Sequence, residues 1–314
     1  VPGVRSQRTR FQKLLAYLKR YWFLYLLVLP GFVFMIVFNY GPMYGIQLAF
    51  KDYHANLGIW GSPWVGLEHF REMIADANFW RAAKNTLIIN GYNIVFKTTF
   101  TIFLALMLNE LRLKKVKSCV QTAAYLPYFL SWVIFAGLVQ VFLEYPSSSG
   151  SSGGVIMFFG GEPINFLTRP DLFRAIVVIS NIIKNAGYGT IVYLASMSTI
   201  NPALYEAAKM DGSNRLQMML HITIPAILPT IVILLILDLS SLFSANFDQI
   251  YNLYNNYVLS TGDVLSTYIY RISLGGGTSF ELSTAINLVL QVLGLIVVLI
   301  TNKFVSKLDI MGIF

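Results

Sequence analysis

The amino-acid sequence predicts an all-α integral membrane protein with six transmembrane helices. Of its 314 residues, 56% are hydrophobic and only 12% are charged, and the mean hydropathy is +0.61. Soluble domains carry about 25% charged residues, roughly twice the fraction in this chain. Six separate apolar runs lie along the sequence, and each is near the length of about 20 residues that crosses a bilayer. These observations exclude a soluble globular fold.

The six predicted spans form a single series, and no second soluble domain interrupts it. The first span follows a basic N-terminal arm and contains no charged residue. The second span contains Lys97 and four threonines, the fourth contains Lys184 and two asparagines, and the fifth contains Asp238. The spans are residues 21–38, 85–108, 120–142, 172–197, 227–247 and 282–300.

The distribution of Lys and Arg predicts the orientation, because six spans place both ends of the chain on one side. That side would hold 14 of the 23 Lys and Arg residues, whereas the opposite side would hold seven and the spans the remaining two. Since positive residues accumulate in cytoplasmic loops, both termini are expected in the cytoplasm. The predicted division is a cytoplasmic basic arm at 1–20, a transmembrane domain at 21–304 and a cytoplasmic tail at 305–314.

Several kinds of chemistry lack the residues that they need. One cysteine and three histidines give no basis for a disulfide framework or a zinc site. The phosphate-binding pattern GxxxxGK followed by Ser or Thr does not occur, so the chain itself is not expected to hydrolyse ATP. A membrane enzyme would need paired carboxylates or a metal cluster, whereas Asp248 and Asp263 stand 15 residues apart without a histidine between them. The formal charge of +8 follows membrane topology rather than a nucleic-acid-binding surface.

Between the fourth and fifth spans, residues 200–226 predict a helix–turn–helix on the cytoplasmic face. Asn201 is a favourable N-cap, and the proline after it suits the first helical position. Gly212 is expected to end this helix, and Asp211 or Ser213 to cap a second short helix that runs to the next proline. On these residues alone, the segment is equally compatible with an ordinary amphipathic connection between two spans.

The same loop carries a longer pattern. Glu-Ala-Ala at 206–208 is followed at fixed spacing by Gly212, Ile222 and Pro225, with Ile224 directly before the proline. This pattern resembles the EAA loop of binding-protein-dependent ABC importer permeases, in which a leucine replaces Ile224. In that family the loop docks on the ATPase subunit and transmits its closure to the membrane helices. The resemblance implies that Glu206 contacts the ATPase and that Gly212 keeps the turn tight. The implied coupling residues are Glu206, Ala207, Ala208, Asp211, Gly212 and Pro225.

The likeness extends over most of the chain. Residues 39–52, 61–66, 121–132 and 246–255 look like the complex-carbohydrate, maltose-like branch of this family, which includes permeases for pectin- and alginate-derived oligosaccharides. The resemblance implies a multi-pass protein of the bacterial inner membrane that pairs with a second homologous permease. It also implies a dimeric ATPase that binds ATP and Mg²⁺, an extracytoplasmic solute-binding protein, and no cofactor in this chain. The expected function is ATP-driven import of a uronic-acid oligo- or polysaccharide by alternating access, without enzyme activity in this subunit.

Two polar stripes predict a route for the sugar. Residues at i, i+3, i+4 and i+7 share one face of a helix, and polar groups in membrane spans normally face the bundle interior or a water-filled cavity. One stripe falls on the fourth span and one on the fifth, at offsets from the coupling loop similar to those of the sugar-binding faces in maltose-type permeases. The stripes are Asn181, Lys184, Asn185 and Tyr188, and Asp238, Ser241, Leu242 and Ala245.

Lys184 admits two interpretations. An ammonium that faces the path would attract the carboxylates of an acidic sugar, whereas a Lys184–Asp238 pair would only neutralise two buried charges. Lys97 is interpreted as a snorkelling side chain or a contact between helices rather than as a site. The alternative function is an ion-coupled secondary transporter, which usually shows internal repeats and acidic residues in its spans. Because the spans hold one clear carboxylate, Asp238, and no repeat is evident, the importer is favoured.

Overall fold

The computed structural model describes residues 17, 19–145, 164–244, 246–276 and 279–306, which contain no β-strand beyond one isolated antiparallel bridge between Lys51 and Trp64. The predicted arm at 1–20 and tail at 305–314 lie mostly outside these described residues. Five helices are long and apolar enough to cross a membrane, and one bent pair of helices makes six if it counts as a single span. The prediction of an all-helical membrane protein is therefore confirmed.

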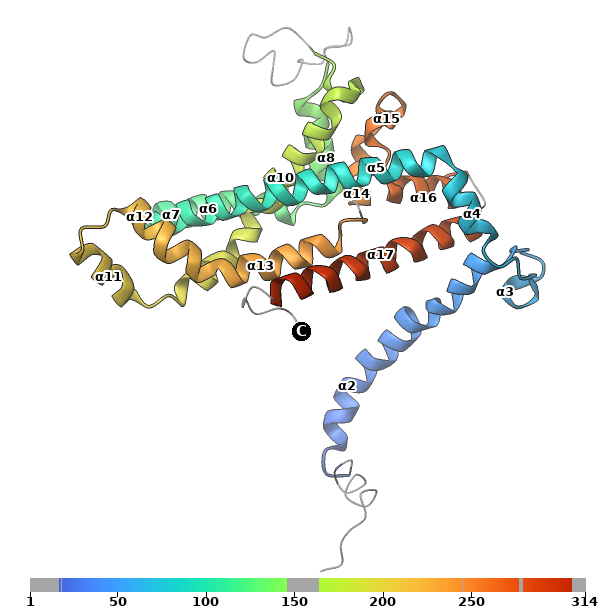
Figure 1. Cartoon of the computed structure of the whole chain (residues 1–314), viewed down its shortest axis with the longest axis horizontal. Coiled ribbons are helices and arrows are strands. Elements are labelled where there is room, and N and C mark those ends of the chain that lie inside the picture. Colours follow the sequence, from blue (N-terminus) through green and yellow to red (C-terminus); the bar gives the residue numbers. More distant parts are fainter. Residues whose placement is uncertain (1–16, 18, 146–163, 245, 277–278, 307–314) are drawn as a thin grey trace, which may run out of the picture.

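The long elements combine α-helix with π and 3-10 turns (Figure 1). They are α2 (Trp22–Met35) with η1 (Ile36–Tyr40) and η2 (Gly41–Phe50); α5 (Ala77–Tyr92) with η3 (Asn93–Lys97) and α6 (Thr98–Glu110); α7 (Lys114–Tyr125) with η4 (Leu126–Phe129) and α8 (Trp132–Phe142); α10 (Pro170–Ser198); α12 (Arg215–Met218) with η6 (Met219–Thr223) and α13 (Ile224–Ser240); and α17 (Phe280–Ser306). The short elements are α3 (Gly58–Gly61), α4 (Glu68–Ala75), η5 (Phe166–Thr168), α11 (Pro202–Met210), α14 (Phe247–Leu253), η7 (Asn256–Val258), α15 (Leu259–Gly262) and α16 (Leu265–Ser273).

The third predicted span, 120–142, is not a single helix. The pair α7–η4 and the following α8 are bent by 106° at the break between them. Pro127 removes a backbone N–H, and the chain becomes extended at Leu130. The helix restarts at Ser131, whose hydroxyl oxygen accepts a hydrogen bond from the backbone N–H of Ile134 at 3.3 Å. The prediction of one continuous helix was wrong because apolar length alone does not reveal such a break.

The fifth span begins earlier than its predicted range, 227–247. A continuous helical segment runs from Arg215 to Ser240, so the second short helix predicted for the loop is the first part of the span. Pro225 does not interrupt it, and the π turn η6 lies directly before the proline. Local π turns accommodate a proline in a membrane helix, because they allow the freed backbone groups to find other partners.

The same span also ends earlier than predicted. The hydroxyls of Ser240 and Ser241 donate to the carbonyls of Leu237 and Asp238 at 2.6 and 2.8 Å, and the helix stops there. Consequently Ser241 and Leu242 lie in a turn and do not continue the helical face of Asp238, as the predicted stripe required. The last residue of that stripe, Ala245, lies outside the described residues.

Three clusters of buried apolar side chains hold the spans together. The first joins α5, α8, α10 and α14 through Ile89, Ala136, Phe173 and Ile250. The second cluster packs α4 and α5 against α16 and α17, and the third joins α6, α10 and α13. Only α10 contributes to both the first and the third cluster, among the described helices. α10 therefore connects these two clusters, while the continuous second span, Ala77–Glu110, contributes to all three through α5 and α6.

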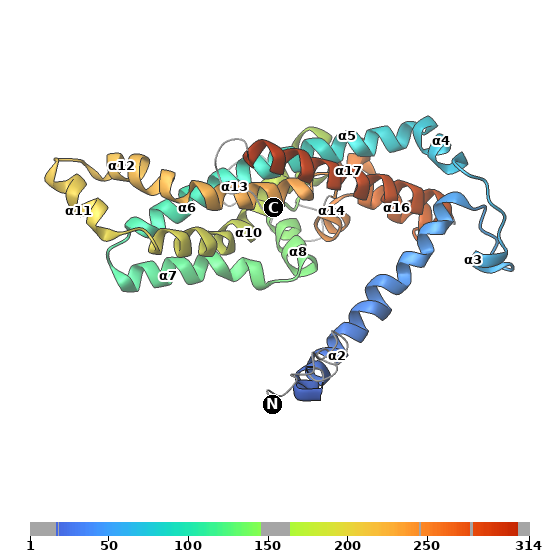
Figure 2. The ribbon, with the colours of Figure 1, turned by 60° about the horizontal axis from the view of Figure 1, so that its bottom comes forward.

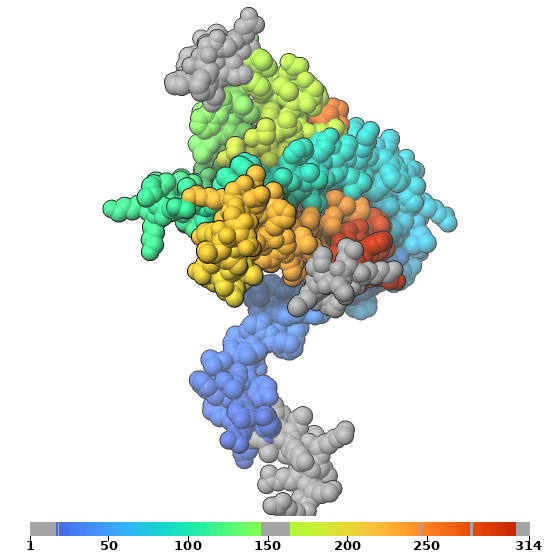
Figure 3. Space-filling model, turned by 60° about the vertical axis from the view of Figure 1, so that its left-hand side comes forward, coloured from blue at the N-terminus to red at the C-terminus, as the bar shows by residue number. Residues whose placement is uncertain are grey.

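The first span stands apart from this bundle. α2 projects away from the other helices (Figures 1 and 2), and in the space-filling view it extends below the body of the chain (Figure 3). None of its residues is buried, although nearly all are apolar. Such a helix requires an apolar surrounding, which lipid hydrocarbon supplies.

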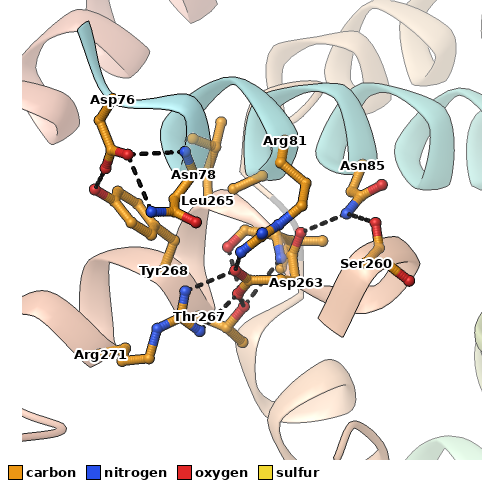
Figure 4. Close-up of polar contacts among 12 residues, drawn as sticks. Asp76, Asn78, Arg81, Asn85, Ser260, Asp263, Leu265, Thr267, Tyr268 and Arg271 are labelled. Carbon is orange, nitrogen blue, oxygen red and sulfur yellow. Dashed lines mark hydrogen bonds and ion pairs between the residues drawn. The ribbon is translucent and has the colours of Figure 1, made fainter. Parts of the chain in front are cut away.

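A charged network lies at the end of the bundle opposite α11, where α5 meets α15 and α16 (Figure 4). The fully buried carboxylate of Asp263 accepts two hydrogen bonds from Arg271, at 3.0 and 2.7 Å, and one from the Thr267 hydroxyl at 3.0 Å. A guanidinium nitrogen of Arg81 lies 3.5 Å away. The hydrogen bond to Asp263 raises the pKa of Arg271 above its ordinary value. Two cations therefore compensate one buried carboxylate.

A neighbouring contact adds to this network. The Tyr268 hydroxyl donates to the carboxylate of Asp76, which also accepts the backbone N–H of Asn78 at 2.8 Å and so caps α5. Burial opposes the ionisation of Asp76, yet the hydrogen bonds from Tyr268 and Asn78 lower the pKa of Asp76 below its ordinary value. The start of α5 is thereby fixed on α16.

We predict that Asp263→Asn destabilises the protein, because it leaves two guanidinium groups without their buried counter-charge. Breaking one side of a buried ion pair costs about 3–5 kcal/mol. Thermal unfolding in detergent should show a clear fall in the midpoint. The matched control is Asp52→Asn, since Asp52 is half exposed and contacts only His54 as an ion pair at 3.3 Å. Equal midpoints for the two variants would contradict a structural role for Asp263.

Candidate functional site

The loop between α10 and α13 lies at one end of the bundle (Figures 1 and 2). α11 begins at Asn201, whose side-chain oxygen accepts the backbone N–H of Ala203 at 3.0 Å. Gly212 follows α11 with φ +80°, in the left-handed region that favours glycine. The second helix is capped by Asn214 in a capping box with Gln217, and not by Asp211 or Ser213 as predicted.

This loop is tied to the bundle at its two ends, where Ile200, Met219 and Ile224 pack against the third cluster, and it is largely exposed between them. The Tyr205 hydroxyl lies 2.8 Å from the Thr223 hydroxyl, which ties α11 to the start of the fifth span. Leu204, Met210 and Leu216 present large apolar side chains to solvent, and 88% of Met210 is exposed. Of the predicted coupling residues, Ala208 is half-buried and the others are exposed: Glu206, Ala207, Asp211, Gly212 and Pro225. The loop is therefore a free surface with both charged and apolar groups.

A polar pocket of about 170 Å³ lies between the second, fourth and fifth spans. The ammonium of Lys97 is 2.8 Å from the carboxylate of Asp238, and the Thr98 hydroxyl is 3.4 Å from the other carboxylate oxygen. The side chains of this ion pair are 26% and 29% exposed. Asn185 and Tyr193 of α10 line the same pocket. Charged groups in membrane spans normally face the interior of the bundle or a water-filled cavity, and the position of this ion pair in the pocket is consistent with that rule.

The pocket brings together two predicted residues of the sugar path, Asn185 and Asp238. The amide of Asn185 also donates to the side-chain oxygen of Asn181, so these two lie side by side on α10. Tyr188 lies elsewhere, stacked on the ring of Tyr128 with centroids 3.8 Å apart. The backbone carbonyls of Ser241 and Leu242, rather than their side chains, accept hydrogen bonds from Asn90 at 3.2 and 2.8 Å.

Lys184 does not pair with Asp238, so that interpretation was wrong. Its ammonium donates to the backbone carbonyls of Pro127 at 3.2 Å, Tyr128 at 3.0 Å and Leu130, and only 5% of the residue is exposed. An ammonium has three N–H donors, and all three are used. No donor remains for the carboxylate of a sugar.

The partner of Asp238 is Lys97, which the sequence suggested only as a snorkelling side chain or a contact between helices. The contact between helices is confirmed, since the ion pair joins the second span to the fifth. Thr98 and Tyr193 were not singled out by the sequence. The sequence did contain a signal for the Lys97–Asp238 pair. Asp238 is the one clear carboxylate in the predicted spans, and only two lysines, Lys97 and Lys184, lie in those spans as candidate partners.

Comparisons with known proteins show the family to which the chain belongs. Residues 97–309 match the family model described as "Binding-protein-dependent transport system inner membrane component". The polygalacturonan/rhamnogalacturonan transport system permease protein YteP of Bacillus subtilis (strain 168) is 40% identical over 314 residues, which are 100% of this chain and 97% of that protein. Protein LplB of the same organism is 39% identical over 300 residues, which are 96% of this chain and 93% of that protein.

Solved structures agree. The crystal structure of a bacterial ABC transporter involved in the import of the acidic polysaccharide alginate contains a similar chain with TM-score 0.85 and 41% identity, covering 94% of this chain and 99% of that chain. A second structure, of the alginate ABC transporter in complex with an alginate pentasaccharide-bound periplasmic protein, gives TM-score 0.85 and 40% identity over 95% and 99% of the two chains. The chain belongs to the family of inner membrane components of binding-protein-dependent transport systems, and it is a multi-pass ABC importer permease rather than an enzyme or an ion-coupled secondary transporter.

Proposed function

We propose that this permease moves an acidic oligo- or polysaccharide into the cytoplasm by alternating access. The observation that carries the proposal is the partly exposed Lys97–Asp238 ion pair inside the layer of membrane helices. Its cation can exchange a protein carboxylate for a sugar carboxylate, because a charge-assisted hydrogen bond to either is similar in strength. The names of a polygalacturonan/rhamnogalacturonan permease and of an alginate importer among similar proteins support a uronic-acid substrate.

The proposed substrate path continues from this pair along α10. Asn181 and Asn185 supply amide groups that match sugar hydroxyls, and Tyr188, which is 41% exposed and stacked on Tyr128, presents an aromatic side chain next to them. Ser241 and Leu242 lie beyond the end of α13, where their carbonyls rather than a helical face border the path. Ala245 completes the proposed set from the sequence alone.

We further propose that the exposed loop 200–226 couples this path to a dimeric ATPase. Exposed apolar side chains such as Met210 next to the carboxylate of Glu206 suit a cleft in another protein. In this proposal ATP and Mg²⁺ are bound by the partner ATPase subunits, and this chain holds no cofactor. Closure of the ATPase moves the loop, and α10 and α13, which leave the loop on either side, carry the movement into the membrane.

The proposed assembly fixes the remaining topology. Both termini lie in the cytoplasm with the loop, so that the arm 1–20 and the tail 305–314 flank a transmembrane domain at 21–304. A second homologous permease completes the path, and an extracytoplasmic solute-binding protein docks at the opposite end, near α3 and α4. A similar structure that includes a periplasmic protein loaded with alginate pentasaccharide supports this last partner.

We predict that Gly212→Pro releases the ATPase from the complex while the second permease stays bound. Proline requires φ near −65°, whereas Gly212 has φ +80°, and the substitution also removes its N–H bond to the Lys209 carbonyl at 3.1 Å. A pull-down in mild detergent with mass spectrometry measures both partners.

The matched control is Gly66→Pro in the segment between the first two spans. Gly66 has φ +68° and donates its N–H to the Phe50 carbonyl at 3.2 Å, so both variants suffer the same backbone change. Loss of the ATPase with both variants would indicate general unfolding. Retention of the ATPase with Gly212→Pro would overturn the proposed coupling loop.

We predict that Lys97→Met raises KM for an acidic oligosaccharide about tenfold or more. A hydrogen bond to a charged group contributes about 1.5–3 kcal/mol, and about 1.4 kcal/mol corresponds to a factor of ten. The measurement is uptake into proteoliposomes that contain the complete importer, with the natural oligosaccharide and with a carboxyl-reduced derivative.

Because Lys97→Met leaves Asp238 without a partner, a second variant separates folding from recognition. Lys97→Met combined with Asp238→Leu removes both charges from the pocket and leaves neither without its counter-charge. We expect it to assemble normally, to transport the reduced derivative, and to lose the preference of the wild type for the acidic sugar. An unchanged ratio of KM values for the two sugars would rule out charge recognition at this pair.

A further inference from the structure

The broken third span creates a local problem for the backbone. At the end of η4 the chain leaves helical geometry, so its last carbonyls have no continuing helical turn to bond, although the Pro127 carbonyl still accepts the Leu130 N–H at 3.3 Å. In a membrane environment an unsatisfied carbonyl is energetically costly, because hydrocarbon offers it no hydrogen-bond donor. The end of a helix also carries a partial negative charge, which favours a cation nearby. The break therefore needs a donor from another element, and a positive one fits best.

Lys184 of α10 is that donor. Its ammonium bonds the carbonyls of Pro127, Tyr128 and Leu130, the three that surround the break. Aromatic rings enclose it as well, since it lies 5.8 Å from the centroid of Tyr128, 5.3 Å from Trp132 and 5.8 Å from Phe135. One side chain thus contacts the last residues before the break and the first turn of α8 after it.

The surrounding contacts leave little freedom for α10 to slide past the break. A Cβ at Gly187 would lie 2.0 Å from the carbonyl oxygen of Ala124, so the backbones of α10 and α7 are in direct contact. Tyr188 stacks on Tyr128 with an interplanar angle of 3°. Lys184, Gly187 and Tyr188 follow the i, i+3, i+4 spacing and form one face of α10. This face of α10 packs directly against the residues on the N-terminal side of the break.

The bend sends α8 toward α14. Ala136 of α8 packs in the same buried cluster as Val177 of α10 and Ile250 of α14. Gln140 donates its side-chain amide to the Asn252 carbonyl at 2.7 Å. The direction in which α8 leaves the break therefore determines how α8 meets α14.

We propose that Lys184 is a positioning residue of the transport cycle, which locks the broken third span onto α10 so that α8 and α14 move with that helix. This inference rests on the coupling role proposed for residues 200–226. From Lys184 to the end of α10 at Ser198 is roughly 20 Å of uninterrupted helix, and Asn201 begins the loop directly afterwards. Lys184 is then the point where movement from the loop passes from α10 to a second segment.

The experiment uses the complete importer in proteoliposomes with Lys184→Met, Lys184→Arg and the neighbouring control Ile183→Met. Ile183 is 55% exposed and lies about 100° around the helix from Lys184. We expect Lys184→Met to keep basal ATP hydrolysis, to lose its stimulation by loaded binding protein, and to reduce transport of acidic and carboxyl-reduced oligosaccharide alike by tenfold or more. Arginine can still donate to carbonyls, so Lys184→Arg should recover a substantial part of both, and Ile183→Met should match the wild type.

A second measurement reads the position of α8 directly. Nitroxide labels are placed at Val141 of α8 and Asp248 of α14, both exposed, in a Cys119→Ser background, and the distance between them is measured with and without trapped nucleotide. In the wild type we expect one narrow distance distribution that shifts with nucleotide. In Lys184→Met we expect a broad distribution that does not respond.

Three results would overturn the inference. If Lys184→Met impairs only the acidic sugar and the label distances stay normal, Lys184 is a substrate ligand. If it shows wild-type transport and distances, Lys184 has no positioning role although coupling stands. If the wild type itself shows no response to nucleotide, the proposed coupling fails together with this inference.

Discussion

Hydrocarbon offers no hydrogen-bonding partner, and this constraint decides where each polar group within the membrane-crossing helices must lie. Polar groups in the spans are paired with other groups of the protein. Asp238 forms an ion pair with Lys97, and Lys184 donates to the carbonyls at the break of the third span. The hydroxyls of Ser240 and Ser241 donate to carbonyls of the last turn of α13. Two of these contacts join segments more than 50 residues apart. Apolar packing brings the spans together, but these few polar contacts fix which residues face one another.

The same constraint gives α10 its central place. It is a continuous helix of 29 residues, whereas the second, third and fifth spans are each interrupted by a π turn or a break. One face of α10 lines the polar pocket with Asn185, and another closes the broken span with Lys184. Its last turn leads into the coupling loop at Asn201. An uninterrupted helix transmits displacement along its length, while the interrupted neighbours supply the points at which they can bend.

The sequence predicted the features that depend on local composition and not those that depend on a partner. Apolar length located six segments, and Asn201 with Gly212 correctly marked the start and end of α11. The break in the third span could not be predicted, because Pro127 is tolerated in many helices and the ammonium that bonds the carbonyls at the break comes from Lys184, a residue remote in sequence. The end of α13 was missed for a similar reason, since two serines close the helix by bonding the preceding turn. Partners remote in sequence leave no periodic signal.

Lys97 and Lys184 show why charge in a span does not by itself define a binding site. Both interrupt apolar sequence, and the polar stripe on the fourth span left two interpretations of Lys184, as a sugar ligand or as the partner of Asp238. In the structure Lys184 is buried, with 5% exposure, and its ammonium donates to three backbone carbonyls. The Lys97 side chain, in contrast, is 26% exposed beside a cavity and is paired with a carboxylate. Removing an ammonium from three backbone carbonyls exposes all of them, so a ligand cannot compete for it cheaply. A carboxylate partner can be replaced by another carboxylate at little net change in charge or hydrogen bonding. A lysine in a span can therefore bind substrate only if a substrate group can replace its protein partner. Of these two lysines, Lys97 meets that condition and Lys184 does not.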